Sequence, residues 1–176
     1  LVFLIFTDNI VLVQGVEGWH TGNGSRVLVL AGEEVHDQTR QPQKNHLLVY
    51  GAEREMAALA ADPQTLVNGV NEAGGMSFLA HPFDPPASFT GESDLSWVSW
   101  DVEGYTGLEL WNFMTSFKSL LTSRLVALRY ALNPDLGIEG PPPETLKKWD
   151  ELLAAGKKVA VVGGADAHGQ SYRMWG

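Results

Sequence analysis

Short apolar runs that end at polar or glycine residues recur along the chain. They occupy residues 1–6, 27–31, 47–50, 76–80, 108–111 and 159–162. Runs of this length, bounded by turn residues, are typical of buried strands. Segments with helical spacing of apolar residues lie between several of them. This alternation predicts βα units, and therefore an α/β fold rather than an all-β fold.

Three segments carry the signals of helices. Residues 62–75 open with Asp-Pro and close with Gly-Gly, which suit a helix N-cap, a first turn and a C-terminal stop. Apolar residues at helical spacing predict one continuous helix over 117–132. A further helix is expected to open after 141–143 and to end at Gly156. Residues 83–105 show neither pattern and predict a long loop that could cover a site.

Residues of metal-ligand type accompany four of the apolar runs. Glu34, His81, Asp166 and His168 follow their runs, whereas His46 precedes its own. Asp166 and His168 are two positions apart, so on extended backbone they point the same way. Carboxylate oxygens and neutral imidazoles are the usual ligands of zinc, manganese and iron. Asp166 and His168 also fit an ordinary polar turn, and spacing gives no physical account of the placement of His46.

Several short motifs occur in a defined order across the chain. They are Thr7-Asp8, G-E-E ending at Glu34, H-L-L at His46, L-A-H-P containing His81, G-L-E-L-W-N at 107–112 and G-A-D-A-H at 164–168. The ordered set resembles the PHP superfamily (polymerase and histidinol phosphatase domains), which are metal-dependent hydrolases. The resemblance implies an α/β fold, namely a distorted β/α barrel of PHP type, with residues 1–176 as a single, partial domain.

The resemblance also implies roles for individual residues. Glu34 would bridge two metal ions, and His46 and His81 would bind one of them. Asp166 would bind the second ion, and His168 a third. Glu34, Asp166 and His168 are then the expected catalytic residues, and the cofactors are two or three divalent ions (Zn, Mn or Fe) in a complete domain.

Two departures from the family pattern affect these expectations. The family opens with an H-x-H strand, and residues 1–176 contain no H-x-H; the T-D-H motif ends here in Asn9. The site at Glu34, His46 and His81 keeps its ligands, whereas the site at Asp166 lacks two. The chain is therefore expected to be either a fragment of a longer enzyme, which we favour, or a degenerate member.

The leading functional hypothesis is a metal-dependent hydrolase that acts on a small-molecule phosphoester. A carbamate or amide substrate, and a non-catalytic metal-binding domain, are the alternatives. A third and weaker hypothesis is a metal-free enzyme with Asp166 and His168 as an acid/base pair. Near the ligands, Glu109 is expected to be a hydrogen-bonding core residue and His36 a solvent-facing loop residue, while Glu33 competes with Glu34 for the ligand role.

Charge and composition limit the kinds of partner that the protein is expected to bind. A formal charge of −9 and a pI near 4.9 argue against unaided binding of nucleic acid. The absence of cysteine excludes disulfides and thiolate ligands within these residues. No membrane association is expected, because the apolar run at 1–6 is far too short to span a bilayer. A cytoplasmic location is the working expectation, and the sequence does not predict an oligomeric state.

Overall fold

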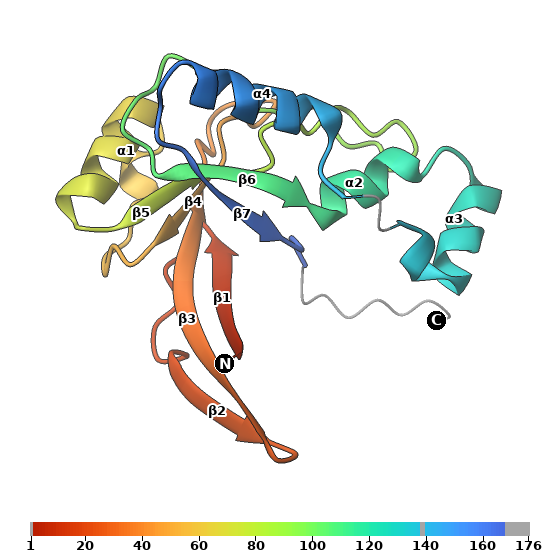
Figure 1. The fold of residues 1–176 in the computed structure, drawn as a ribbon, viewed down its shortest axis with the longest axis horizontal. Coiled ribbons are helices and arrows are strands. Elements are labelled where there is room, and N and C mark those ends of the chain that lie inside the picture. Colours follow the sequence, from red (N-terminus) through yellow and green to blue (C-terminus); the bar gives the residue numbers. More distant parts are fainter. Residues whose placement is uncertain (1, 138–139, 168–176) are drawn as a thin grey trace.

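The computed structural model describes residues 2–137 and 140–167. Within them the chain forms a curled seven-stranded sheet, a half-barrel, with helices packed against it (Figure 1). The strand order is β1-β3-β4-β5-β6-β7, and β2 pairs with β3 beside this path. The strands are β1 (Val2–Asn9), β2 (Gly18–Gly22), β3 (Ser25–Val35), β4 (Leu47–Tyr50), β5 (Met76–Leu79), β6 (Gly107–Asn112) and β7 (Ala160–Gly164). The predicted α/β class is confirmed, and the architecture is compatible with a partial α/β barrel.

The sheet is mixed in direction. β1 and β3 are parallel, as are β5 with β6 and β6 with β7. β4 runs antiparallel to both of its neighbours, β3 and β5. The amino end of β4 therefore lies beside the carboxyl ends of β3 and β5, which matters for the site described below.

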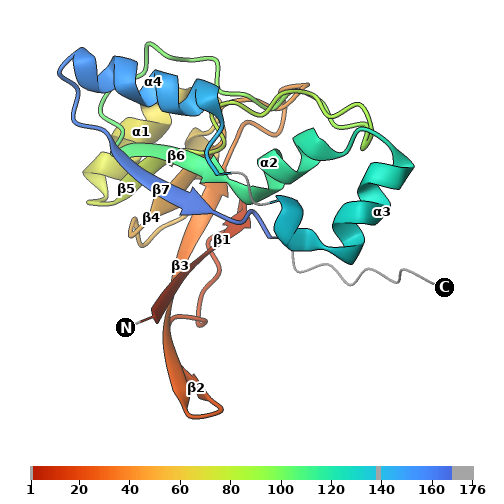
Figure 2. The same ribbon diagram turned by 45° about the vertical axis from the view of Figure 1, so that its right-hand side comes forward.

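Four α-helices are present in the described residues: α1 (Pro63–Glu72), α2 (Phe113–Leu120), α3 (Arg124–Leu132) and α4 (Pro143–Ala154). Short 3₁₀ turns lie at η1 (Ala57–Leu59) and η2 (Pro134–Gly137). Helices α1 and α4 cover one face of the sheet (Figures 1 and 2). Their apolar residues join the main core through Leu66, Val67 and Val70 of α1 and Leu152 of α4. None of the described helices is both long and apolar enough to cross a membrane.

Helix α1 matches its prediction from the sequence. The Asp62 side chain accepts a hydrogen bond from the Thr65 backbone N–H (2.7 Å), and Pro63 occupies the first turn. Gly74, just past the end, has a φ of +73°, a conformation that residues with a Cβ rarely adopt. An N-cap hydrogen bond such as that of Asp62 contributes about 1 kcal/mol to helix stability. Helix α4 also lies where it was predicted.

The single helix predicted over 117–132 is wrong. Helix α2 ends at Leu120, and α3 begins only at Arg124. Ser123 caps α3, because its side chain accepts a hydrogen bond from the Val126 N–H (3.4 Å), and serine competes well for such a position. The apolar residues of α3 do not form core: the exposed fractions of Leu125 and Leu132 are both 79%.

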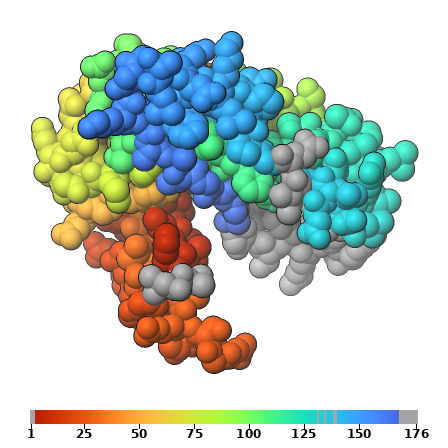
Figure 3. Space-filling model, viewed as in Figure 1, coloured from red at the N-terminus to blue at the C-terminus, as the bar shows by residue number. Residues whose placement is uncertain are grey.

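A β-hairpin was also missed. β2 and β3 pair up to Gly22 and Ser25, and the two residues between them, Asn23 and Gly24, have positive φ angles of 50° and 77°. Asn-Gly is the preferred pair for such two-residue turns, so the signal was present in the sequence. The hairpin projects from the body of the molecule (Figure 3). At its other end β3 extends to Val35 through its pairing with β1 and β4, so Glu33 and Glu34 lie inside this strand rather than after it.

Candidate metal centre

Three strands bring Glu34, His46 and His81 together. Glu34 lies near the carboxyl end of β3, and His81 follows the carboxyl end of β5. His46 directly precedes β4, whose reversed direction puts its amino end between the other two. The strand direction therefore supplies the physical reason for the position of His46 that spacing alone lacked.

The three side chains converge on one carboxylate oxygen. His46 Nδ1 lies 2.8 Å from Glu34 Oε1, and His81 Nε2 lies 3.3 Å from the same oxygen. The two imidazole rings meet edge to face, with their centroids 4.9 Å apart. All three residues are buried, and their ligand atoms lie within 4.8 Å of one another.

The electrostatics couple the three groups. Burial raises the pKa of Glu34, but hydrogen bonds from His46 and His81 outweigh it and hold that pKa well below its usual range. Burial lowers the pKa of His81, but the hydrogen bond and charge of Glu34 prevail and raise it to about 9. In the metal-free protein, the carboxylate thus stabilises a protonated His81 next to it.

The spacing and donor types of the triad fit a divalent metal ion. Tetrahedral zinc sites with bonds of about 2.0–2.1 Å place neighbouring ligand atoms roughly 3.3 Å apart. The two imidazole nitrogens lie at comparable distances of 2.8 and 3.3 Å from Glu34 Oε1. His46 Nε2 is buried without a hydrogen-bond partner among the described residues, so this ring has an unused donor or acceptor atom. Two imidazoles and one carboxylate suit zinc, manganese or iron. The group can therefore hold a metal ion.

His36 corrects one expectation from the sequence. It is buried rather than solvent-facing, and its ring stacks on that of His46 with a centroid distance of 4.2 Å and an angle of 10° between the planes. Burial and the nearby His46 lower the pKa of His36 to about 4. The signal was its spacing two residues beyond Glu34, because alternate residues of extended chain point the same way, and His36 directly follows the end of β3.

Glu109 supports His81 from behind, as expected for a hydrogen-bonding core residue. Its Oε2 accepts hydrogen bonds from the His81 backbone N–H (2.8 Å) and from Asn112 Nδ2 (3.1 Å). The backbone of His81 has a φ of +27°, and the hydrogen bond from its N–H helps to hold that conformation. Burial raises the pKa of Glu109 to about 7, and the charge of Asp166 adds to this rise.

A buried ion pair that no sequence pattern indicated borders the site. Lys118 Nζ lies 3.2 Å from Asp84 Oδ2 and 2.6 Å from Glu92 Oε2. Asp84 Oδ2 is also 3.8 Å from His81 Nδ1. These contacts connect α2 and the predicted loop at 83–105 to the histidine, so the loop is anchored beside the triad.

A second anchor of the 83–105 loop is Asn45, the residue before His46. The Asn45 side-chain oxygen accepts hydrogen bonds from the backbone N–H groups of Val98 (2.9 Å) and Ser99 (3.3 Å). The loop is therefore tied directly to the residue that precedes a member of the triad.

The other predicted ligands have different outcomes. Asp166 follows β7 with a φ of +50°, and its charge acts on Glu109. It is not part of the ligand group that the described residues form at Glu34. His168 lies outside the described residues. A second or third metal position at Asp166 and His168 therefore stays a prediction.

Glu33 and Asn9 complete the surroundings of Glu34. Glu33, the rival candidate, points to the opposite face of β3, where its Oε2 accepts a hydrogen bond from the Met56 N–H (2.9 Å) and burial raises its pKa. Asn9, which occupies the histidine position of the T-D-H motif, is the Cα partner of Glu34 across the β1–β3 pair. Glu34 rather than Glu33 therefore faces His46 and His81.

Comparison with protein-family models, with curated proteins and with solved structures finds no match to this chain.

Proposed function

We propose that this chain is a metal-dependent hydrolase domain in which Glu34, His46 and His81 hold a divalent ion. One observation carries the proposal: three buried side chains of metal-ligand type, brought together from three adjacent strands, present ligand atoms within 4.8 Å of one another. A bound zinc, manganese or iron ion would supply Lewis acidity, which lowers the pKa of water toward ~7 and neutralises developing negative charge.

The protein groups have distinct tasks in this proposal. Three protein ligands leave one position of a tetrahedral site for water or substrate, an arrangement typical of catalytic rather than structural zinc sites. His81 must release its proton before it can bind an ion, because only neutral imidazole is a ligand. Glu109 holds the backbone of His81, and His36 packs on the ring of His46, so neighbouring residues support both ligating histidines.

The resemblance of the ordered motifs to the PHP superfamily supports the finer part of the proposal. It favours a distorted barrel of PHP type, a small-molecule phosphoester as substrate, and further ions at Asp166 and His168. A carbamate or amide substrate is compatible with the same ligands. So is a domain that binds a metal ion without catalysis, as the missing H-x-H and Asn9 would allow.

Metal content and hydrolysis, measured together on the purified 176-residue chain, test the proposal. Inductively coupled plasma mass spectrometry should find at least one divalent ion per chain, lost in His81→Ala. His20→Ala is the matched control, because His20 is an exposed histidine on β2 whose ring hydrogen-bonds with the Val16 carbonyl oxygen, away from the triad. Aryl phosphoesters and aryl carbamates are then assayed before chelation, after it, and after manganese or zinc is restored.

Each result has a definite meaning. Hydrolysis that is lost on chelation and restored by the metal supports the proposal, and the better substrate assigns the class. An ion bound without hydrolysis of either class indicates a non-catalytic metal-binding domain. An ion count that His81→Ala leaves unchanged contradicts the triad. Hydrolysis that resists chelation indicates acid/base chemistry without a metal.

A further inference from the structure

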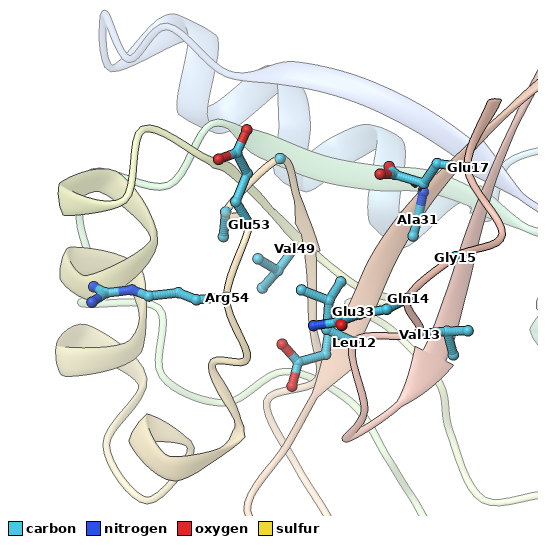
Figure 4. Close-up of a pocket in the computed structure, with 12 residues that line it drawn as sticks. Leu12, Val13, Gln14, Gly15, Glu17, Ala31, Glu33, Val49, Glu53 and Arg54 are labelled. Atoms are coloured by element: carbon cyan, nitrogen blue, oxygen red, sulfur yellow. Dashed lines mark hydrogen bonds between the residues drawn. The ribbon is translucent and has the colours of Figure 1, made fainter.

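A second site lies on the opposite face of β3 from the triad. A cavity of about 290 Å³ is formed by the β1–β2 connection, by β3, and by the segment that follows β4 (Figure 4). Its volume is close to the lower limit for pockets that bind small molecules. Because successive residues of a strand face opposite sides, Glu33 lines this cavity while Glu34 faces the histidines.

Only one of the two Glu33 carboxylate oxygens has a hydrogen-bond partner among the described residues. Its exposed fraction is 1%, and its Oε2 accepts a hydrogen bond from the Met56 N–H. Its Oε1 has no hydrogen-bond partner among the residues that the structure describes. An unpartnered buried acceptor costs about 1–3 kcal/mol, so a donor that reached this oxygen would recover free energy. Oε1 therefore keeps an acceptor position that the described protein atoms do not fill.

The charges around the cavity favour a cationic partner. Glu17, Glu33 and Glu53 line it, against a single cation, Arg54. Figure 4 shows the Arg54 side chain extending toward α1, away from Glu33. No ion pair of Arg54 with a carboxylate occurs in the described part of the chain. The remaining lining includes Leu12, Val13, Val49 and Ala52, which offer apolar contacts.

We propose that this cavity binds a small molecule that carries an ammonium group on a short apolar body. The ammonium donates a hydrogen bond to Glu33 Oε1, and the apolar body packs against Leu12 and Val49. This site is independent of the metal centre, because the two use opposite faces of β3. It therefore adds a binding function that the proposed hydrolase activity does not require.

The test uses n-butylammonium as the probe and n-butanol as its neutral counterpart. Both are titrated into the isotope-labelled full chain, which has first been stripped of metal so that amine coordination to an ion cannot contribute. Backbone amide shifts in two-dimensional NMR spectra provide the readout. We expect saturable shifts at Ala31 and Met56, with n-butylammonium binding about tenfold tighter than n-butanol, since hydrogen bonds to charged groups are the strong ones.

Three variants separate the possible causes. Glu33→Gln should abolish the preference for the amine, because it places an amide where the free carboxylate oxygen was, while a side-chain oxygen still serves Met56. Ala31→Leu should weaken both probes by filling the cavity. Glu53→Gln, which removes the same charge from the exposed rim, should leave most of the preference intact.

The proposal is overturned by any of three results. They are no saturable shift at Ala31 and Met56, equal affinity for amine and alcohol in the wild type, or equal losses in Glu33→Gln and Glu53→Gln. The first two need no variant, so a substitution that fails to fold does not protect the proposal.

Discussion

Glu33 and Glu34 are neighbours in β3, yet the two faces of the strand give their carboxylates opposite surroundings. On the face of β3 that carries the triad (the inner face), hydrogen bonds from two histidines hold the pKa of Glu34 well below its usual range. On the opposite, outer face, burial raises the pKa of Glu33 and outweighs the backbone N–H groups of Met56 and Ala57, which lower it. Burial is thus common to both positions, and the neighbouring donors decide which protonation state the fold favours.

The largest expected effect is on metal binding, where only the inner glutamate should matter. Glu34→Gln should weaken zinc binding by at least about a hundredfold, because even partners of metal ligands contribute about 10–100-fold. Glu33→Gln, an identical chemical change one residue away, should leave the affinity unchanged. Isothermal titration calorimetry checks both. Equal losses in the two variants would remove the distinction between the faces.

The pH dependence of stability in the metal-free protein should have opposite signs for the two residues. The depressed pKa of Glu34 stabilises the fold above the ordinary glutamate value of 4.5, and this contribution is lost as pH falls. Glu34→Gln should therefore become less stable, relative to the wild type, as pH rises from acid toward neutral. The raised pKa of Glu33 destabilises the fold as pH rises, so Glu33→Gln should gain relative stability over the same range.

His81 should add a loss of stability at alkaline pH, an alkaline limb in the plot of unfolding free energy against pH. Its pKa of about 9 exceeds the ordinary value of 6.5, so its contribution is complete below pH 6.5 and is lost as pH rises through 9. Urea unfolding at a series of pH values provides the free energies of unfolding. An alkaline limb that persists in Glu34→Gln would show that the carboxylate is not its cause.

A substitution at Gly32 tests the β3–β4 pairing, on which the sites on both faces of β3 depend. A Cβ added there would lie 2.7 Å from the Val49 carbonyl oxygen and 2.7 Å from Tyr50 Cδ1. Gly32→Ala should therefore destabilise the β3–β4 pair by about 1–3 kcal/mol and weaken both the metal site and the outer cavity. Gly22→Ala is the matched control, since a Cβ there meets nothing within 4 Å. Equal free energies of unfolding for the two variants would contradict the close approach.

The smallest expected effect is a gain in the zinc affinity of the triad when a fourth ligand is added. Asn9 pairs with Glu34 across β1 and β3, so the side chains of both lie on the same face of the sheet. Asn9→His should increase zinc affinity about tenfold, or about 1.4 kcal/mol, by adding an imidazole near the carboxylate. Asp8→His places the same group on the opposite face and should have no effect. An equal gain in both variants would point to nonspecific binding by an added histidine.

Several parts of the fold followed from local signals in the sequence. Helix α1 is specified by Asp62, Pro63 and Gly74, whose effects act within a single turn of backbone. The break at Ser123 was missed because an apolar stripe at helical spacing does not show whether anything covers it. The exposed Leu125 shows that nothing in the described residues does.

The sequence by itself determined the α/β class and the residue types from which the triad is built. It also determined that adjacent glutamates face opposite sides, because the period of a strand is two residues. Only the tertiary structure decided that β4 runs antiparallel to its neighbours, which brings His46 to Glu34 and His81. The partners Met56, Asp84 and Lys118 were decided in the same way. The physical reason is that periodicity and capping act within a few residues, whereas pairing depends on contacts between segments far apart in the chain.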